Sequence, residues 1–162
     1  MLILGIDPGS TRIGFGLIEK NKGNLKLIKC GLLKIKSQDK GQRLIEAAES
    51  FSRLLKIRRP DLISIEKLFF MKNMKTALEV AQTRGVLTLI SLQSKIPVLE
   101  FSPSEIKVAA TGYGLADKKS VGKMVSKILK IDKIDKPDDV TDALATAICA
   151  ANHLRTKVVN LI

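Results

Sequence analysis

The segment LILGIDPGSTRIGFGLIEK (residues 2–20) decides the fold, because it holds two apolar runs joined by a tight turn. The first run is almost wholly apolar and predicts a strand buried in a core. That run ends in Asp7, and Pro8, Gly9 and Ser10 follow at once, which is ordinary turn chemistry. Asp7 therefore has two interpretations: a turn residue, or one ligand of a metal or phosphate site at the carboxyl end of the strand.

Outward from this segment, the chain predicts an α/β domain with a mixed sheet covered by helices. Short turn sequences separate the first three strands, so these strands form an antiparallel meander. Further on, short apolar runs alternate with longer runs of helical periodicity, and Pro60 ends the first helix. The predicted strands are residues 2–7, 12–19, 25–36, 62–67 and 96–101, and the predicted helices are residues 41–59, 75–94, one beginning near 117, and about 138–155.

The composition predicts one globular domain spanning residues 1–162. Apolar residues make up 45% of the chain and charged residues 27%, which is typical of a folded protein. No apolar run approaches the roughly 18 residues that a membrane span needs, and Asp7 interrupts the opening run, so a signal peptide is not expected. Cys30 and Cys149 lack zinc-ligand spacing and predict buried thiols in a reducing compartment. We therefore expect a cytoplasmic location and no membrane partner.

The charge balance gives the first indication of function. Twenty-eight Lys and Arg residues against sixteen Asp and Glu residues give a net charge of +12. Such an excess attracts polyanions, and nucleic acid is the leading partner. An acidic membrane surface would call for a basic amphipathic anchor, and none is obvious. A protein that is basic without acting on nucleic acid, such as a ribosome-associated one, stays open at this point.

Three further acids repeat the pattern set by Asp7. Glu66 ends the apolar run LISIE, while Asp139 and Asp142 lie three apart near the start of the last helix, on one side of its apolar stripe. Each has an ordinary explanation, because strand ends are often solvated and acids are favoured in a first helical turn. Together, however, carboxylates that border a packed face repel one another unless a cation lies between them.

This set of acids favours a hard divalent ion. Oxygen ligands without a nearby His or Cys favour Mg²⁺ or Mn²⁺ over zinc. In a basic chain, such a cluster fits two-metal phosphodiester cleavage, in which one ion activates a water and a second, ~3.5–4 Å away, stabilises the leaving oxygen. The residues therefore favour a nuclease over a simple nucleic-acid binder.

Five motifs, in this order and spacing, resemble the RuvC family of bacterial Holliday-junction resolvases: GIDPGSTRIGFGLIE, IEKLFFMKN, QTRG, TGYGLADKKSV and DVTDALATAI. The resemblance covers about residues 2–154. It implies a ribonuclease H-like fold, with a mixed five-stranded sheet of three antiparallel strands and then two parallel ones, flanked by helices. It also implies a homodimer that cuts four-way junction DNA by paired symmetric nicks, leaving 5′-phosphate and 3′-hydroxyl ends, in homologous recombination and DNA repair. A branch-migration complex of the RuvAB type is the implied partner.

By this resemblance, the catalytic, metal-binding acids of the family correspond to Asp7, Glu66, Asp139 and Asp142. Asp7 is then the ligand shared by two Mg²⁺ ions, and Mn²⁺ is expected to substitute. Some relatives have His where this chain has Asp139. The extra Asp138 leaves an ambiguity of one residue; the spacing to DALA and the helical wheel favour Asp139, and Asp138 is better explained as a cap.

Four residues are expected to contact DNA. Phe69 falls where the family carries an aromatic that wedges against bases at the crossover, although core packing is the ordinary explanation for any Phe. Lys107 and Lys118 fall on basic contacts of the family. Lys119 belongs to a lysine face of the helix that follows TGYG, which is either solvated surface or part of the field that attracts phosphates. Two arginines are left without a role: Arg12 and Arg84.

Other functions make different demands on the same residues. A non-catalytic junction-binding module would lack one or more of the acids. A ribonuclease H-like nuclease acting on RNA or other branched intermediates would use the same four acids, so it is the main alternative. An ATP-phosphate loop of the sugar-kinase and actin type needs a second domain, for which 162 residues leave no room.

The predicted helix over residues 75–94 has a wide apolar face around Met74, Leu78, Ala81 and Gly85. Either this face forms the interface of a homodimer, or it is buried inside the monomer.

Overall fold

The computed structural model describes residues 1–68, 74–132 and 137–159. None of the helices in that part of the chain combines the length and the apolar character that crossing a membrane requires. In chain order the elements are β1 (Leu2–Asp7), β2 (Arg12–Asn21), β3 (Asn24–Lys34), α1 (Lys40–Arg58), β4 (Leu62–Glu66), α2 (Met74–Gln93), β5 (Val98–Phe101), α3 (Pro103–Thr111), α4 (Lys118–Leu129) and α5 (Asp138–Val159).

The predicted order of elements was wrong at one place, because it omitted α3. This helix starts with a capping box: the Ser102 hydroxyl accepts from the Glu105 N–H, the Glu105 carboxylate accepts from the Ser102 N–H, and Pro103 occupies the first turn. The signal is present in the sequence. It was overlooked because nine residues make only about two and a half turns and follow β5 directly.

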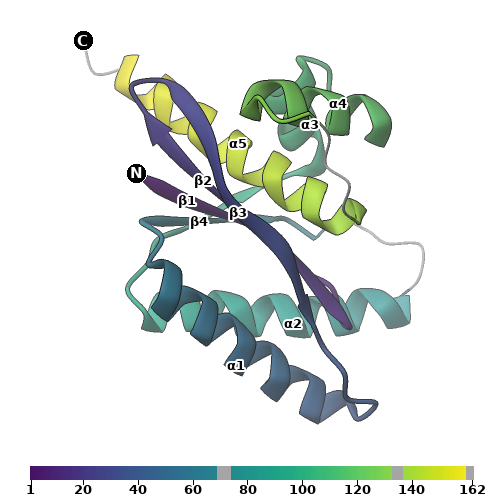
Figure 1. Ribbon diagram of the computed structural model, residues 1–162. Coiled ribbons are helices and arrows are strands. Elements are labelled where there is room, and N and C mark those ends of the chain that lie inside the picture. Colours follow the sequence, from purple (N-terminus) through teal and green to yellow (C-terminus); the bar gives the residue numbers. More distant parts are fainter. Residues whose placement is uncertain (69–73, 133–136, 160–162) are drawn as a thin grey trace.

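The sheet is mixed, as predicted. Its strand order is β3-β2-β1-β4-β5, with β1, β2 and β3 antiparallel and β4 and β5 parallel to β1. Figure 1 shows α1 and α2 on one face of the sheet and α5 on the other, with α3 and α4 outside α5. Three antiparallel and two parallel strands between layers of helices confirm the predicted fold class.

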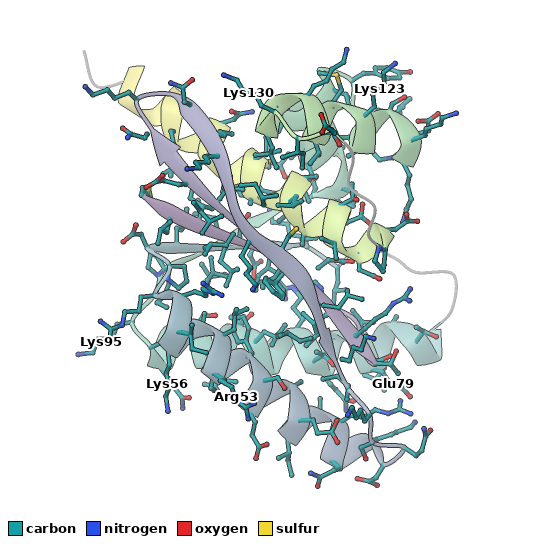
Figure 2. All side chains as sticks on the ribbon, in the orientation of Figure 1. Arg53, Lys56, Glu79, Lys95, Lys123 and Lys130 are labelled. Carbon is teal, nitrogen blue, oxygen red and sulfur yellow. The ribbon has the colours of Figure 1, made fainter. Side chains whose placement is uncertain are left out.

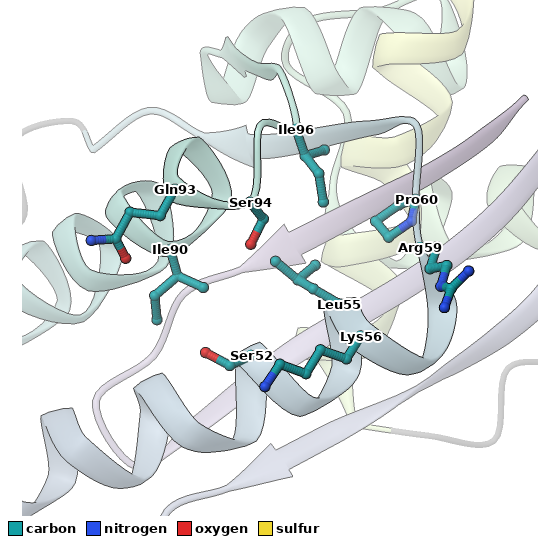
Figure 3. Close-up of a pocket in the computed structure, with 9 residues that line it drawn as sticks. All are labelled: Ser52, Leu55, Lys56, Arg59, Pro60, Ile90, Gln93, Ser94 and Ile96. Carbon is teal, nitrogen blue, oxygen red and sulfur yellow. The ribbon is translucent and has the colours of Figure 1, made fainter.

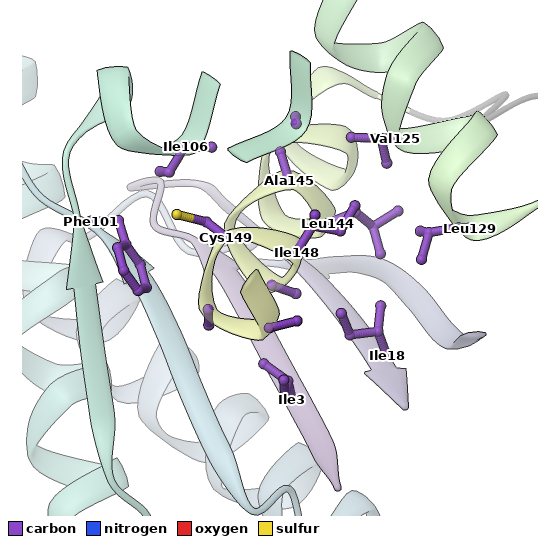
Figure 4. Packing of buried hydrophobic residues seen from close by; sticks show 14 of the residues in the cluster. Ile3, Ile18, Phe101, Ile106, Val125, Leu129, Leu144, Ala145, Ile148 and Cys149 are labelled. Carbon is purple, nitrogen blue, oxygen red and sulfur yellow. The ribbon is translucent and has the colours of Figure 1, made fainter. Parts of the chain in front are cut away.

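The alternation of side chains along β1 divides the core into two clusters. Leu4 and Ile6 point to one face and pack with Phe51 of α1 and Leu87 of α2. Ile3 points to the other face, where it belongs to the cluster built on α5 (Figure 4). The face that holds Ile3 is the one on which Asp7 also lies.

Glycines let α5 approach the sheet closely. A Cβ on Gly5 of β1 would collide with the carbonyl oxygen of Ala143, and a Cβ on Gly14 of β2 would collide with that of Asp139. Gly14 is the partner of Asp7 in the β1–β2 register. The amino-terminal turn of α5 therefore rests directly on the backbone beside Asp7.

Candidate active site

Asp7 and Glu66 end two neighbouring parallel strands, β1 and β4. Ile6 is paired with Ile65 in the register, so the residues that follow lie side by side at the same edge of the sheet. Both side chains belong to the face covered by α5. Asp7 shares the face of Ile3, four residues earlier on β1. Glu66 shares the face of Ser64, which donates its hydroxyl to a backbone carbonyl of α5 at 2.9 Å. Two carboxylates thus meet under the start of α5.

The first turn of α5 adds Asp139 and Asp142 to this edge. Their side chains are 22% and 31% exposed, whereas that of Asp138 is 79% exposed. Asp138 was expected to cap the helix, but it is the first residue of α5 itself. Of the consecutive pair, Asp139 is the one turned toward the strand ends, because its backbone rests on Gly14.

Two cations lie against the acids of α5. Lys118 Nζ donates to Asp142 Oδ2 at 3.2 Å and lies 3.8 Å from Asp138 Oδ2. Arg12 Nε lies 2.8 Å from Asp139 Oδ2 and forms an ion pair with it. Asp139 Oδ2 is buried, and this ion pair is its contact with positive charge.

The strand-end acids hold their protons more tightly than ordinary carboxylic acids. Burial, reinforced by the charges of Asp142, Glu66 and Asp139, raises the pKa of Asp7 from 3.8 to about 7. Burial and then Asp142 raise the pKa of Glu66. Burial also raises the pKa of Asp142, although Lys118 opposes the shift. Asp7 thus interacts electrostatically with the other three acids, and the charges of Lys118 and Arg12 offset the four carboxylates only in part.

This environment fits a hard divalent cation, for which oxygen is the preferred ligand. The raised pKa of Asp7 marks negative charge that the protein compensates only in part, since the nearby cations Lys118 and Arg12 are paired with the acids of α5. In the described part of the chain, no three acidic, His or Cys side chains already converge on one point, and two of the four acids are paired with Lys118 and Arg12. The residues that could hold such an ion are Asp7, Glu66, Asp139 and Asp142.

The lysines expected to contact DNA lie next to these acids. Lys107 of α3 is close enough to Glu66 for its charge to oppose the rise in the Glu66 pKa. Lys118 and Lys119 begin α4 and are exposed. Phe69, the fourth residue expected to contact DNA, lies outside the described residues.

One arginine near the site was not assigned a role from the sequence. Arg84 Nε of α2 donates to the Glu66 carbonyl at 3.3 Å, and its Nη2 pairs with the Glu100 carboxylate. Arg84 therefore ties α2 to the ends of β4 and β5. The available signal is a charged residue in the middle of a largely apolar helix, but its partners on β4 and β5 are far from it in the sequence.

A separate hollow lies at the opposite end of the strands, between α1 and α2 (Figure 3). It measures about 410 Å³, with Leu55, Ile90 and Ile96 on its wall and Lys56 and Arg59 at its rim. No acidic residue is among the described residues that line it. It offers no ligands for a cation, so the acids at the carboxyl ends of β1 and β4 are the candidate active site.

Comparison with known proteins agrees with the motifs. The model of the family Crossover junction endodeoxyribonuclease RuvC matches residues 3–150. The RuvC of Thermosipho melanesiensis is 46% identical over 156 residues, covering 96% of this chain and 99% of its own. That of Petrotoga mobilis is 41% identical over 157 residues, covering 96% of each chain.

Solved structures give the same result. The structure of Thermus thermophilus RuvC in complex with Holliday junction substrate superposes with a TM-score of 0.90 at 28% identity, covering 97% of this chain and 96% of that one. The yeast mitochondrial Holliday junction resolvase Ydc2, at 15% identity and a TM-score of 0.71, shares the fold; the match covers 99% of this chain and 84% of that one.

Proposed function

The chain belongs to the RuvC family of crossover junction endodeoxyribonucleases, and from this premise we propose that it resolves four-way DNA junctions by paired, divalent-metal-dependent nicks. The observation that carries the proposal is the meeting of Asp7, Glu66, Asp139 and Asp142 at one edge of the sheet, with the pKa of Asp7 raised to about 7. In a non-catalytic binding module, four carboxylates that repel each other and the DNA phosphates would weaken binding without any catalytic gain.

The reaction is hydrolysis of a phosphodiester. A water oxygen bonds to phosphorus, the P–O3′ bond breaks, and the departing 3′-oxygen takes up a proton, which leaves a 5′-phosphate and a 3′-hydroxyl. Bound Mg²⁺ supplies a water of lowered pKa and neutralises the charge that develops on the leaving oxygen. Asp7, Glu66, Asp139 and Asp142 would hold the ions, two by the resemblance to the family, with Asp7 contributing to both; Mn²⁺ is expected to substitute.

The basic side chains next to the acids position the DNA. Lys118 is 69% exposed on its side chain, so it can exchange its contact with Asp142 for a phosphate oxygen without unfolding any structure. Lys107, on the Glu66 side, provides a second positive charge for the backbone of the cut strand. Lys119 and Phe69 complete the set of proposed DNA contacts.

Two symmetric nicks on a two-fold symmetric junction call for two identical sites, so we propose a homodimer. In α2, Leu78, Leu89 and Leu92 are 63%, 56% and 59% exposed, and a Cβ on Gly85 would meet no atom within 4 Å. These residues lie at helical spacing along one face of α2. Of the two alternatives for this helix, the exposed leucines favour the interface. A RuvAB-type partner remains an expectation from the resemblance, and a cytoplasmic location remains an expectation from the composition.

A cleavage assay on three substrates tests the proposal. A mobile four-way junction, a DNA duplex and an RNA–DNA hybrid are each incubated with the protein and Mg²⁺, and with EDTA as a control. We expect nicks in two opposed strands of the junction, ends that ligase can seal, and no cutting in EDTA. Preferential cutting of the hybrid would instead support the alternative nuclease function on RNA.

A further inference from the structure

A groove about 670 Å³ in volume runs along α4, on the side that faces the start of α5. Its wall on α4 is made of lysines, and Thr141 and Asp138 of α5 form part of the opposite wall. Lys118, at one end of the groove, also touches Asp142, so the groove opens from the candidate active site. Lys130, just after α4, marks the other end.

The lysines are held outward by the packing of α4. Val121, Val125 and Leu129 are buried against the rest of the protein. The opposite positions therefore face solvent, and the lysines on them recur at helical spacing. They are Lys119, Lys123, Lys127 and Lys130.

The charge in the groove suits a polyanion. Five lysines and two aspartates, Asp132 and Asp138, are among the described residues that line it, which leaves a local excess of three positive charges. None of those lining residues is aromatic, so the groove lacks the rings that stack on unpaired bases. Its chemistry matches the phosphate backbone, which is bound without regard to sequence.

The length of the groove sets how much backbone it can hold. From Lys123 to Lys130 there are seven residues, or roughly 10 Å of helix axis at ~1.5 Å per residue. One DNA strand carries a phosphate every ~3.4 Å along the duplex axis, so that distance corresponds to about three phosphates, one for each of the three lysines.

We infer that the α4 groove holds the sugar–phosphate backbone of one junction arm, over about three phosphates beyond the one that is cut, through Lys123, Lys127 and Lys130. The inference rests on the proposed function and deepens it, because it assigns a path to DNA that leaves the active site. The path fixes the angle at which an arm leaves the protein, whereas the lysines next to the acids fix only the phosphate to be cut.

The test combines protein variants with chemically neutralised DNA. The groove variant is K123Q/K127Q/K130Q, and the control variant R53Q/K56Q/K95Q removes the same charge from exposed residues at the opposite end of the molecule (Figure 2). Junctions with single methylphosphonates, placed one at a time along each arm strand, are titrated with each protein in Ca²⁺ at several salt concentrations.

For the wild-type protein we expect a run of about three sensitive positions next to the cut site, each weakening binding by roughly three- to eightfold at 0.1 M salt. In the groove variant these positions should lose their effect, to less than about twofold, and the slope of log K against log salt should fall by up to about 2.7. The control variant should keep the sensitive positions.

Two results would overturn the inference. One is equal weakening by the groove and control variants with no position-specific change, which is what a general electrostatic field produces. The other is retention of all sensitive positions by the groove variant. A failure of the proposed function is distinguishable from either, since the wild-type protein would then not prefer the junction to duplex in the same titrations.

Discussion

Gly14 of β2 lies against the backbone of Asp139 at the start of α5, so closely that a Cβ at position 14 would collide with the Asp139 carbonyl oxygen. Gly14 is also the strand partner of Asp7. One residue without a side chain therefore sets the distance between the strand that carries the first acid and the helix that carries the last two. The geometry of the site depends on this contact as much as on the acids.

Gly14→Ala should destabilise the protein by about 1–3 kcal/mol, because a methyl group is forced into a filled space between sheet and helix. It should also weaken divalent-ion binding by moving Asp139. Urea unfolding and calorimetric titration with Ca²⁺ measure the two effects. The matched control is Gly122→Ala in α4, where the new Cβ would make only ordinary contact at 3.6 Å and helix propensity improves. Equal stability of the two variants would contradict this account of Gly14.

The raised pKa of Asp7 predicts how the stability of the metal-free protein changes with pH. Between pH 3.8 and about 7, the folded chain keeps a proton that the unfolded chain has lost, so the free energy of unfolding falls as pH rises through this window. Asp7→Asn removes the carboxyl group and with it this fall in the free energy of unfolding. In EDTA the variant should melt at a higher temperature than the wild type at pH 8, and the gap should close as pH falls toward 4.

Asp138→Asn is the control for this measurement, because it removes a carboxylate whose side chain is 79% exposed. It should change the melting temperature less than Asp7→Asn does at pH 8. A wild-type protein that is no less stable than Asp7→Asn at pH 8 in EDTA would mean that Asp7 is not under electrostatic strain in the folded state.

Lys118 should compete with divalent ions for Asp142, since its Nζ lies 3.2 Å from Asp142 Oδ2. Lys118→Met removes the rival cation, so Ca²⁺ should bind roughly two- to fivefold more tightly in calorimetry without DNA, a modest gain because the pair is exposed. The same variant should bind the junction more weakly. Lys119→Met, one residue along, serves as the control for ion binding. Unchanged or weaker Ca²⁺ binding by Lys118→Met would show that Lys118 does not occupy the space of an ion.

The exposed face of α2 predicts the oligomeric state. Leu78→Glu combined with Leu89→Glu places charges on that face and should convert a dimer into monomers in light scattering. Leu115→Glu is the control, because Leu115 is 79% exposed and lies between α3 and α4. The monomeric variant should nick one strand without coordinated cutting of the second. A dimer that survives the double substitution would place the interface elsewhere.

Much of this site could be predicted from the sequence, because its signals are local. An acid that ends an apolar strand stands out at Asp7 and Glu66, and the spacing of three residues puts Asp139 and Asp142 on one helix face. The convergence of the two groups required the sheet register, which pairs residues far apart in the chain. The same is true of the glycine contact, and of Arg12 and Arg84, whose partners lie on other elements.

The most direct test of the central claim compares Asp7→Asn with the wild type on one labelled four-way junction, measuring binding in Ca²⁺ and strand cutting in Mg²⁺. Asparagine keeps the size of the side chain and removes the charge that an ion needs, while the lysines proposed to hold the DNA are untouched. The account predicts that Asp7→Asn binds the junction about as tightly as the wild type and cuts neither strand. Cutting by Asp7→Asn at the wild-type rate would contradict it.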